Sequence, residues 1–522
     1  MLQVIKRVGI IGLLGMFAIG FVLLFIYILP KTDDSEDANL NHIGSKGVNL
    51  KALVIGTPPK EGLDELYEEL DKLTLSELGC TLRFEFIPWG DERRQLNIAT
   101  ASGEYDFIPG GVFSDYLTLV SKKAFLDLKA YLYLVPELVD HYKSEDSSLF
   151  KKCEIQGGLY GLPEFSSNRI ANIGAGFFYR EDLRKQWNLE PITDLQTMEA
   201  YLYRAKEEYK GEPIISDNRI WMALWDLITE GKYIEISSAM DTPFVVVEAD
   251  NPGVPISRIN TPEFKVVLSY IKKWFDDGII ASDILMLSDN EGSNGLNLIL
   301  EDKRPCETNT HIWVYTDTYI PQLYSAHPDW EFGYFDYTLS TAKLYLDTLT
   351  KNSVISISSK TSSPEIAIKL LEKLHTDERY YRLMMYGVEG INYSINRGAI
   401  SYNNISVDNI FSGMTAGTDE KLEYKKEPVN KKWQTDVMDV FNAEVERRMQ
   451  TAQYNKLVDF KFNTTSVVSI IDKFDKVKKE VFQPLVCGII DNQEEAINEL
   501  NEKLNEAGFE KYLNEIQNQL QR

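Results

Sequence analysis

Two short segments of the sequence place a carboxylate two residues after an aromatic side chain. Trp89 precedes Asp91, and Phe113 precedes Asp115. Aromatic rings contact the apolar faces of a ligand, and carboxylates accept hydrogen bonds from its hydroxyl groups. The pairs therefore indicate one wall of a small-molecule site. Trp89 and Phe113 can equally be core aromatics, and the residues alone leave both interpretations open.

The elements that would position these pairs are two strands and the helix between them. Leu82, Phe84 and Phe86 alternate with polar residues, and 105–108 is a short apolar run that leads into Pro109-Gly110-Gly111. Residues 91–101 have helical spacing. In an open α/β sheet, ligands bind beyond the carboxyl ends of the strands. We therefore expect both aromatic segments at one edge of a sheet.

The surrounding sequence continues this rhythm of strands and helices. An apolar strand is expected at 50–56, an amphipathic helix at 63–78, an alternating strand at 352–358 and a helix at 364–375. Strands that alternate with helices predict a largely parallel sheet with right-handed crossovers. The fold class expected is α/β.

Length and composition limit the possibilities. A chain of 522 residues is too long for one core, which predicts two or three lobes. The net charge of −24 argues against binding nucleic acid through a basic face. The four cysteines have neither metal-site nor CxxC spacing. We expect buried, unpaired thiols, with a disulfide as the alternative.

The N-terminal segment predicts a membrane anchor. Lys6 and Arg7 precede 8–29, an uncharged run of 22 residues, and acidic residues follow. As a helix this run would be roughly 33 Å long, enough to cross a bilayer. The charge order predicts a cytoplasmic N-terminus and an exported remainder on the extracellular face of the cell membrane. A cleavable signal peptide is the alternative, although the run is longer than a usual h-region and ends in a poor cleavage site.

Several motifs, taken in order, carry a family resemblance. They are GGLYGLP at 157–163, FFYREDL at 177–183, the segment 358–393 with GVEG at 387–390, and 485–522. Over about 50–522 the chain resembles extracellular solute-binding proteins of ABC importers, in the large oligosaccharide-type Gram-positive branch. The resemblance implies a type II periplasmic-binding fold with two lobes and a hinge of several crossings, near 164–170, 335–350 and 390–405.

This resemblance also divides the chain. Residues 1–30 are expected to be the signal anchor and transmembrane helix, and 31–49 a polar tether. The N-terminal lobe would consist of 50–165 and 340–395. The C-terminal lobe would consist of 166–339 and 396–522.

Further site residues follow from a cleft between lobes. Glu164, Phe165 and Ser166 would lie at its floor, and Asn168 is a candidate polar partner of the ligand. Trp313 is expected at the end of a strand over 311–315, where the maltose-binding type stacks a tryptophan on sugar. The remaining candidates are Trp221, Trp225 and Glu389.

These last candidates each have a structural alternative. Trp221 and Trp225 are four residues apart, and so share one helical face, in the core or in the cleft. Glu389 lies between the glycines of GVEG, which permit a tight turn. It either faces the ligand or bonds the backbone.

Sequence motifs of catalysis are missing from the chain. It has no HExxH spacing, no P-loop lysine motif, no GxSxG nucleophile elbow and no complete dinucleotide-binding loop. We therefore expect a protein that is not an enzyme and needs no metal or cofactor. It would capture an oligosaccharide or similar solute for an ABC permease. Peptide ligands, a glycan-active surface enzyme and a non-transport sensor or adhesion module are the alternatives.

Overall fold

A computed structural model provides the fold of this protein. It describes residues 47–521, and Val48–Arg522 form one compact unit. The residues within this range that are not described are 57, 60, 88–91, 112–115, 146–148, 164–174, 237–241, 288–291, 347–352, 397–398, 403–421, 423, 427–429, 458–459 and 461.

The first sheet has five strands, and four of them run in the same direction. β1 and β2 pair in parallel from Val48–Cys80 to Ile55–Ile87, and β3 is parallel to β1. β12 is antiparallel to both β3 and β4, so β4 runs in the direction of β3. The strand order is β2 (Cys80–Ile87), β1 (Val48–Ile55), β3 (Phe107–Gly111), β12 (Ser353–Ile357) and β4 (Leu162–Pro163).

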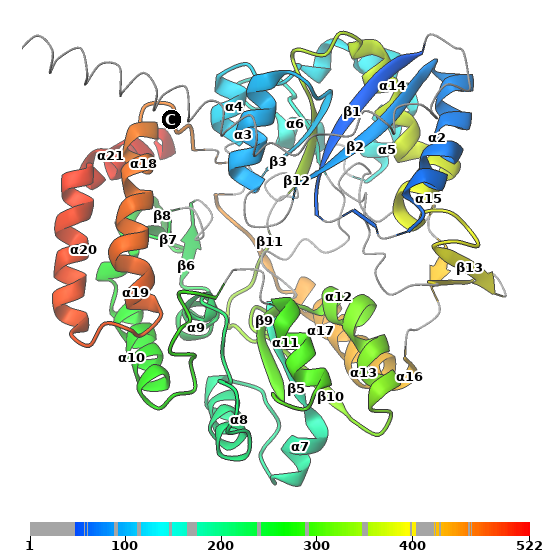
Figure 1. The fold of residues 1–522 in the computed structure, drawn as a ribbon. Coiled ribbons are helices and arrows are strands. Elements are labelled where there is room, and N and C mark those ends of the chain that lie inside the picture. The colour runs from blue at the N-terminus through cyan, green and yellow to red at the C-terminus, as the bar shows by residue number, and fades with distance from the viewer. Residues whose placement is uncertain are drawn as a thin grey trace, which may run out of the picture. The chain divides into compact units, whose positions relative to one another are not determined.

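Helices cover both faces of this sheet because its strands are apolar on both faces (Figure 1). Leu50, Ala52 and Val54 of β1 belong to one hydrophobic cluster, and Leu53 belongs to another. The first cluster contains residues of α2 (Leu63–Glu77), η1 (Leu128–Ala130), α5 (Pro136–Glu145), α6 (Leu149–Cys153), α14 (Pro364–Thr376) and α15 (Glu378–Tyr386), with η2 (Leu132–Leu134) packed against it. The second contains residues of α3 (Glu92–Ser102) and α4 (Tyr116–Ser121).

A second, antiparallel sheet is formed by strands that lie between β4 and β12 in the chain. Its order is β10 (Phe332–Asp336), β5 (Ala175–Arg180) and β9 (Cys306–His311). Phe177 and Tyr179 of β5 enter one cluster, while Phe178 enters another on the opposite face. Helices near these faces include α7 (Glu181–Gln186), α8 (Leu195–Glu208), α9 (Ile220–Thr229), α10 (Pro262–Asp276), α11 (Gly292–Leu300), α13 (Ile320–Ala326), α16 (Lys431–Trp433) and α17 (Asp439–Met449), with π-helical η7 (Gln434–Met438) between the last two.

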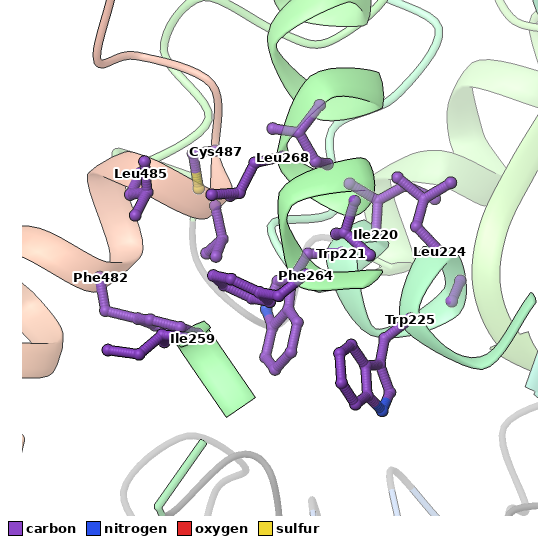
Figure 2. Packing of buried hydrophobic residues seen from close by; sticks show 14 of the residues in the cluster. Ile220, Trp221, Leu224, Trp225, Ile259, Phe264, Leu268, Phe482, Leu485 and Cys487 are labelled. Atoms are coloured by element: carbon purple, nitrogen blue, oxygen red, sulfur yellow. The ribbon is translucent and has the colours of Figure 1, made fainter. Parts of the chain in front are cut away.

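The C-terminal helices complete the largest hydrophobic cluster. They are α18 (Val468–Val477), π-helical η8 (Lys478–Phe482), α19 (Gln483–Val486), α20 (Gln493–Ala507) and α21 (Phe509–Leu520). Gly508 is left-handed (φ 109°) at the junction where α20 ends and α21 begins. Phe482 packs against the rings of Trp221 and Phe264 (Figure 2). This segment therefore shares its core with α9 and α10.

Three small sheets complete the described fold. The three-stranded sheet of β6 (Tyr233–Glu235), β7 (Val245–Glu248) and β8 (Asn251–Ser257) is antiparallel and leads into η3 (Arg258–Asn260). The others pair β11 (Tyr345–Leu346) with β16 (Gln453–Tyr454), and β13 (Tyr393–Asn396) and β14 (Ala399–Tyr402) with β15 (Lys425–Lys426).

The strand expected over 311–315 is wrong. β9 ends at His311, and the chain continues as α12 (Ile312–Val314) and then the π-helix η4 (Tyr315–Tyr319). Ile312 and Tyr315 are buried in one cluster. A separation of three residues suits one face of a helix, so packing decides against the strand that the apolar residues suggested.

Two other expectations concern cysteines and membrane spans. All four cysteines are buried and unpaired, as predicted. Among the residues that the structure describes, no helix combines the length and hydropathy needed to cross a bilayer. The predicted anchor at 8–29 lies outside the described residues.

The predicted tight turn at GVEG is confirmed, because Gly387 and Gly390 both have positive φ (77° and 85°). We expect Gly387→Ala to lower the free energy of unfolding by about 2–3 kcal/mol. Its backbone is strained for any side chain, and a Cβ would lie 2.4 Å from Oδ1 of Asn392. Urea titrations measure the loss. A Cβ at Gly390 meets open space, so Gly390→Ala should cost only about 1 kcal/mol. Equal losses of stability in the two variants would contradict this explanation of the glycine at position 387.

Candidate ligand-binding site

The first sheet brings the carboxyl ends of four strands to one edge. Ile55 and Ile87, the last residues of β1 and β2, are paired. The pairing of Ala52 with Phe107 brings the end of β3 at Gly111 to the same edge. β4 ends there as well, because it runs in the direction of β3.

Seven of the predicted site residues follow these strand ends in the chain. Trp89 and Asp91 come after β2, Phe113 and Asp115 come after β3, and Glu164, Phe165 and Asn168 come after β4. The common edge expected for their strands is confirmed by the register. The seven residues themselves lie outside the described part of the chain, so their role as ligand contacts stays a prediction.

A glycine and a buried tyrosine shape the end of β3. A Cβ on Gly110 would come 2.7 Å from the ring of Tyr116 and 2.9 Å from Val354. The strand end therefore packs closely on α4 and β12, which explains the glycine at this position. Burial raises the pKa of Tyr116 well above its ordinary value, so this phenol stays neutral.

The second sheet has an edge of its own next to the segment 164–174. Ala175, which begins β5, pairs with His311, which ends β9, and Gly176 pairs with Asp336, which ends β10. The chain enters β5 directly from 164–174, the segment that contains three of the predicted residues. The ends of β9 and β10 therefore lie at the same edge of this sheet as the first residues of β5.

Trp313 lies two residues beyond the end of β9, and 42% of it is exposed. Its ring makes an edge-to-face contact with Phe441 at 5.5 Å between centroids. The supporting turn is held by Thr316, whose hydroxyl accepts a hydrogen bond from the Trp433 indole N–H at 2.9 Å. An exposed indole in a packed setting is suited to stacking on a ligand face.

Trp221 and Trp225 are core residues, which was one of the two predicted alternatives. Both belong to the largest cluster, with 5% and 3% exposure. The Trp221 ring meets Phe482 edge-on at 5.3 Å, and Trp225 stacks on Tyr233 at 5.2 Å. Figure 2 shows both indoles projecting from α9 beside Phe264.

A charged cluster at these indoles was not predicted from the sequence. The Arg258 guanidinium lies 4.7 Å from the Trp225 ring centroid and 5.5 Å from that of Trp221, and it forms an ion pair with Glu235. Burial and the nearby Glu235 carboxylate raise the pKa of Asp226 to about 7. Arg258 opposes this shift without cancelling it. The sequence does contain one signal for this site: Asp226 is the single charged residue in the apolar helix IWMALWDLIT.

Glu389 is exposed in the GVEG turn. The backbone N–H of Val388 donates to Oδ1 of Asn392 at 2.8 Å, and Gly390 N–H donates to the Tyr393 carbonyl oxygen. The backbone N–H of Val388 is therefore bonded by Asn392 and not by Glu389. Within the described residues, no group of three or more histidines, cysteines or acids could hold a metal ion.

The α/β sheets and their strand order define a type II periplasmic-binding fold. Two solved structures share it. The N-glycan transport solute binding protein NgtS of Streptococcus pneumoniae, in complex with Man1GlcNAc, has a TM-score of 0.69 at 22% identity, covering 90% of this chain and 98% of that one. An HMO-binding, ABC-transporter-associated solute binding protein of Bifidobacterium longum infantis has a TM-score of 0.65 at 17% identity, covering 91% and 99%.

Sequence comparison points to the same class. A carbohydrate ABC transporter substrate-binding protein of Streptococcus pneumoniae serotype 4 is 25% identical over 502 residues, 91% of each chain. Residues 456–522 match a family model described as a domain of unknown function, DUF3502. The resemblance to extracellular solute-binding proteins of ABC importers is confirmed. The matched proteins are binding proteins of transport systems and not enzymes.

Proposed function

We propose that this protein is a membrane-tethered extracellular solute-binding protein that captures an oligosaccharide and delivers it to an ABC permease. The observation that carries the proposal is the common edge of β1, β2, β3 and β4, which is followed in the chain by aromatic and carboxylate residues. The exposed Trp313 at the end of β9 adds a second aromatic surface.

An oligosaccharide suits these residue types better than a peptide does. A pyranose ring presents apolar C–H faces to indole and phenyl rings, and its hydroxyl groups donate to carboxylates. The related structures support this choice, since one contains Man1GlcNAc and another is described as HMO-binding.

Capture and delivery would use the two lobes, 50–165 with 340–395 and 166–339 with 396–522. Closure around the sugar requires that the closed form bind it more tightly than the open form does. The anchor at 8–29 and the tether at 31–49 would keep the binding unit near the permease and so raise its effective concentration there.

Thermal unfolding of residues 38–522, which contain the compact unit Val48–Arg522, tests the proposal. A neutral oligosaccharide at 100 times its Kd should add about 2.7 kcal/mol of stability, and it should be recovered uncleaved. Hydrolysis of the bound sugar would instead indicate an enzyme. If no oligosaccharide raises the unfolding temperature, the proposal is wrong. Deletion of the gene should then abolish uptake of the sugar that binds.

Trp313→Ala should weaken oligosaccharide binding about tenfold, because the exposed indole provides a stacking face of roughly 1–1.5 kcal/mol. Calorimetric titration measures the Kd. Trp330→Ala is the control, because Trp330 precedes β10 at the end opposite Asp336 and stacks on His327 and Arg180. An unchanged Kd for Trp313→Ala would remove this residue from the site.

A further inference from the structure

Arg258 is a buried arginine that is only partly paired. It is 1% exposed, and its Nη2 donates to Glu235 at 2.5 Å. Among the residues that the structure describes, its buried Nε and Nη1 groups have no hydrogen-bond partner. Leaving a buried donor unpaired is unfavourable, so such groups in a binding protein suggest an acceptor that arrives with a ligand.

The surroundings of Arg258 resemble a saccharide subsite in composition. The indoles of Trp225 and Trp221 lie at 4.7 and 5.5 Å from its guanidinium carbon. Asp226 lies on the same helix as the two indoles, and electrostatic effects of Glu235, Arg258 and Asp336 reach its carboxyl group. The cluster therefore places buried donors beside carboxylate groups, with two core indoles packed near the guanidinium.

This cluster also connects to the edge of the second sheet. Asp336 ends β10 and pairs with Gly176 of β5, the strand that the chain enters from 164–174. Glu235, whose side chain is 31% exposed, provides the side of the cluster nearest to solvent. A ligand at this edge would reach Arg258 past Glu235.

The charges around Arg258 favour a neutral oxygen over a carboxylate as the acceptor. The ion pair with Glu235 already balances the charge of the guanidinium. Asp226 and Asp336 lie near this pair, so together the carboxylates oppose an added negative charge.

We propose that Arg258, together with Asp226 and Glu235, reads a hydroxyl or acetamido oxygen of a neutral sugar and rejects acidic sugars. The inference rests on the proposed function and adds a substrate class to it. Arg258 contributes the two donors, and the three carboxylates contribute the selection against uronic and sialic acids.

Two matched pairs of probes separate these cases. They are β-1,4-mannotetraose with tetramannuronate, and lacto-N-tetraose with its sialylated form. The unit 38–522 should bind at least one neutral member, with the acidic partner about 100-fold weaker or undetectable. Arg258→Gln should weaken neutral binding by at least about tenfold. At pH 8, above the pKa of Asp226, Asp226→Asn, which is isosteric, should reduce the discrimination to less than about tenfold.

Arg180→Gln is the matched control. Arg180 is also buried and lies over an indole, that of Trp330, but its three nitrogen groups are bonded to Asp182 and Asp302. This variant should lose stability and keep its affinity. Circular dichroism verifies the fold of each variant, and Asp226→Asn decides the question if Arg258→Gln does not fold.

Three results would overturn the inference. If folded Arg258→Gln still binds the neutral oligosaccharide with unchanged affinity, Arg258 is not a ligand contact, and the proposed function is unaffected. Equal binding of neutral and acidic partners, or discrimination that persists in Asp226→Asn, would exclude the charge selection. Absence of binding to both pairs in the unsubstituted protein would overturn the proposed function for these sugars together with the inference.

Discussion

Replacing Phe482 with alanine should lower the free energy of unfolding by about 3–5 kcal/mol. Phe482 is buried in η8, and its ring contacts those of Trp221, Phe244 and Phe264 at 5.3, 5.4 and 6.0 Å between centroids. The cavity would open between the C-terminal helices and α9, where relaxation is limited by packing on all sides.

Chemical denaturation followed by tryptophan fluorescence measures this loss. Ile489→Ala is the control within the same C-terminal segment, because Ile489 is partly exposed and its truncation should change stability by less than about 0.5 kcal/mol. If Phe482→Ala lowered the free energy of unfolding as little as Ile489→Ala does, residues 456–522 would not contribute to the hydrophobic core.

The second large effect is a loss of stability in acid caused by His375. This side chain is fully buried in α14, and its Nδ1–H donates to the Leu371 carbonyl oxygen. Burial lowers the pKa of His375 to about 3 in the folded state, below its unfolded value of 6.5. The unfolded state therefore binds more protons between these two values, and stability falls as the pH falls through that window.

At pH 4 the contribution of His375 should amount to about 3 kcal/mol of lost stability relative to pH 7.5. Urea titrations of the unsubstituted protein and of His375→Leu measure it as the difference between their pH profiles. The profiles should be parallel above pH 7 and diverge below pH 6. Profiles that stay parallel down to pH 4 would show that His375 is accessible to protons in the folded state.

The strand ends of the first sheet were predictable because their signals are local. The alternation of Leu82, Phe84 and Phe86 and the glycines after 105–108 indicate where β2 and β3 end, and a parallel arrangement of the two strands then gives them a common edge. The segment around Trp313 was not predictable in this way, because Ile312-Trp313-Val314 is apolar in either conformation. Ile312 and Tyr315 pack into one cluster with residues that are distant in the sequence, and this packing selects the helix.

The Arg258 cluster depends entirely on tertiary contacts. Asp226 and Arg258 are more than thirty residues apart, and Asp336 is more distant still. No period of two or 3.6 residues relates them, so sequence reasoning had no route to their proximity. The two tryptophans of α9 were visible from their spacing, but only burial distinguishes a core face from a ligand face.

The position of β12 affects the order in which the chain can fold. β12 lies between β3 and β4 in the first sheet, yet it follows β3 in the chain by about 240 residues. At synthesis rates of about 5–20 residues per second, the inner edge of β3 would lack its neighbour for on the order of 10–50 s. A nascent chain that ends before Ser353 therefore has an open strand edge, which favours association with other chains. We expect such intermediates to depend on chaperones until β12 emerges.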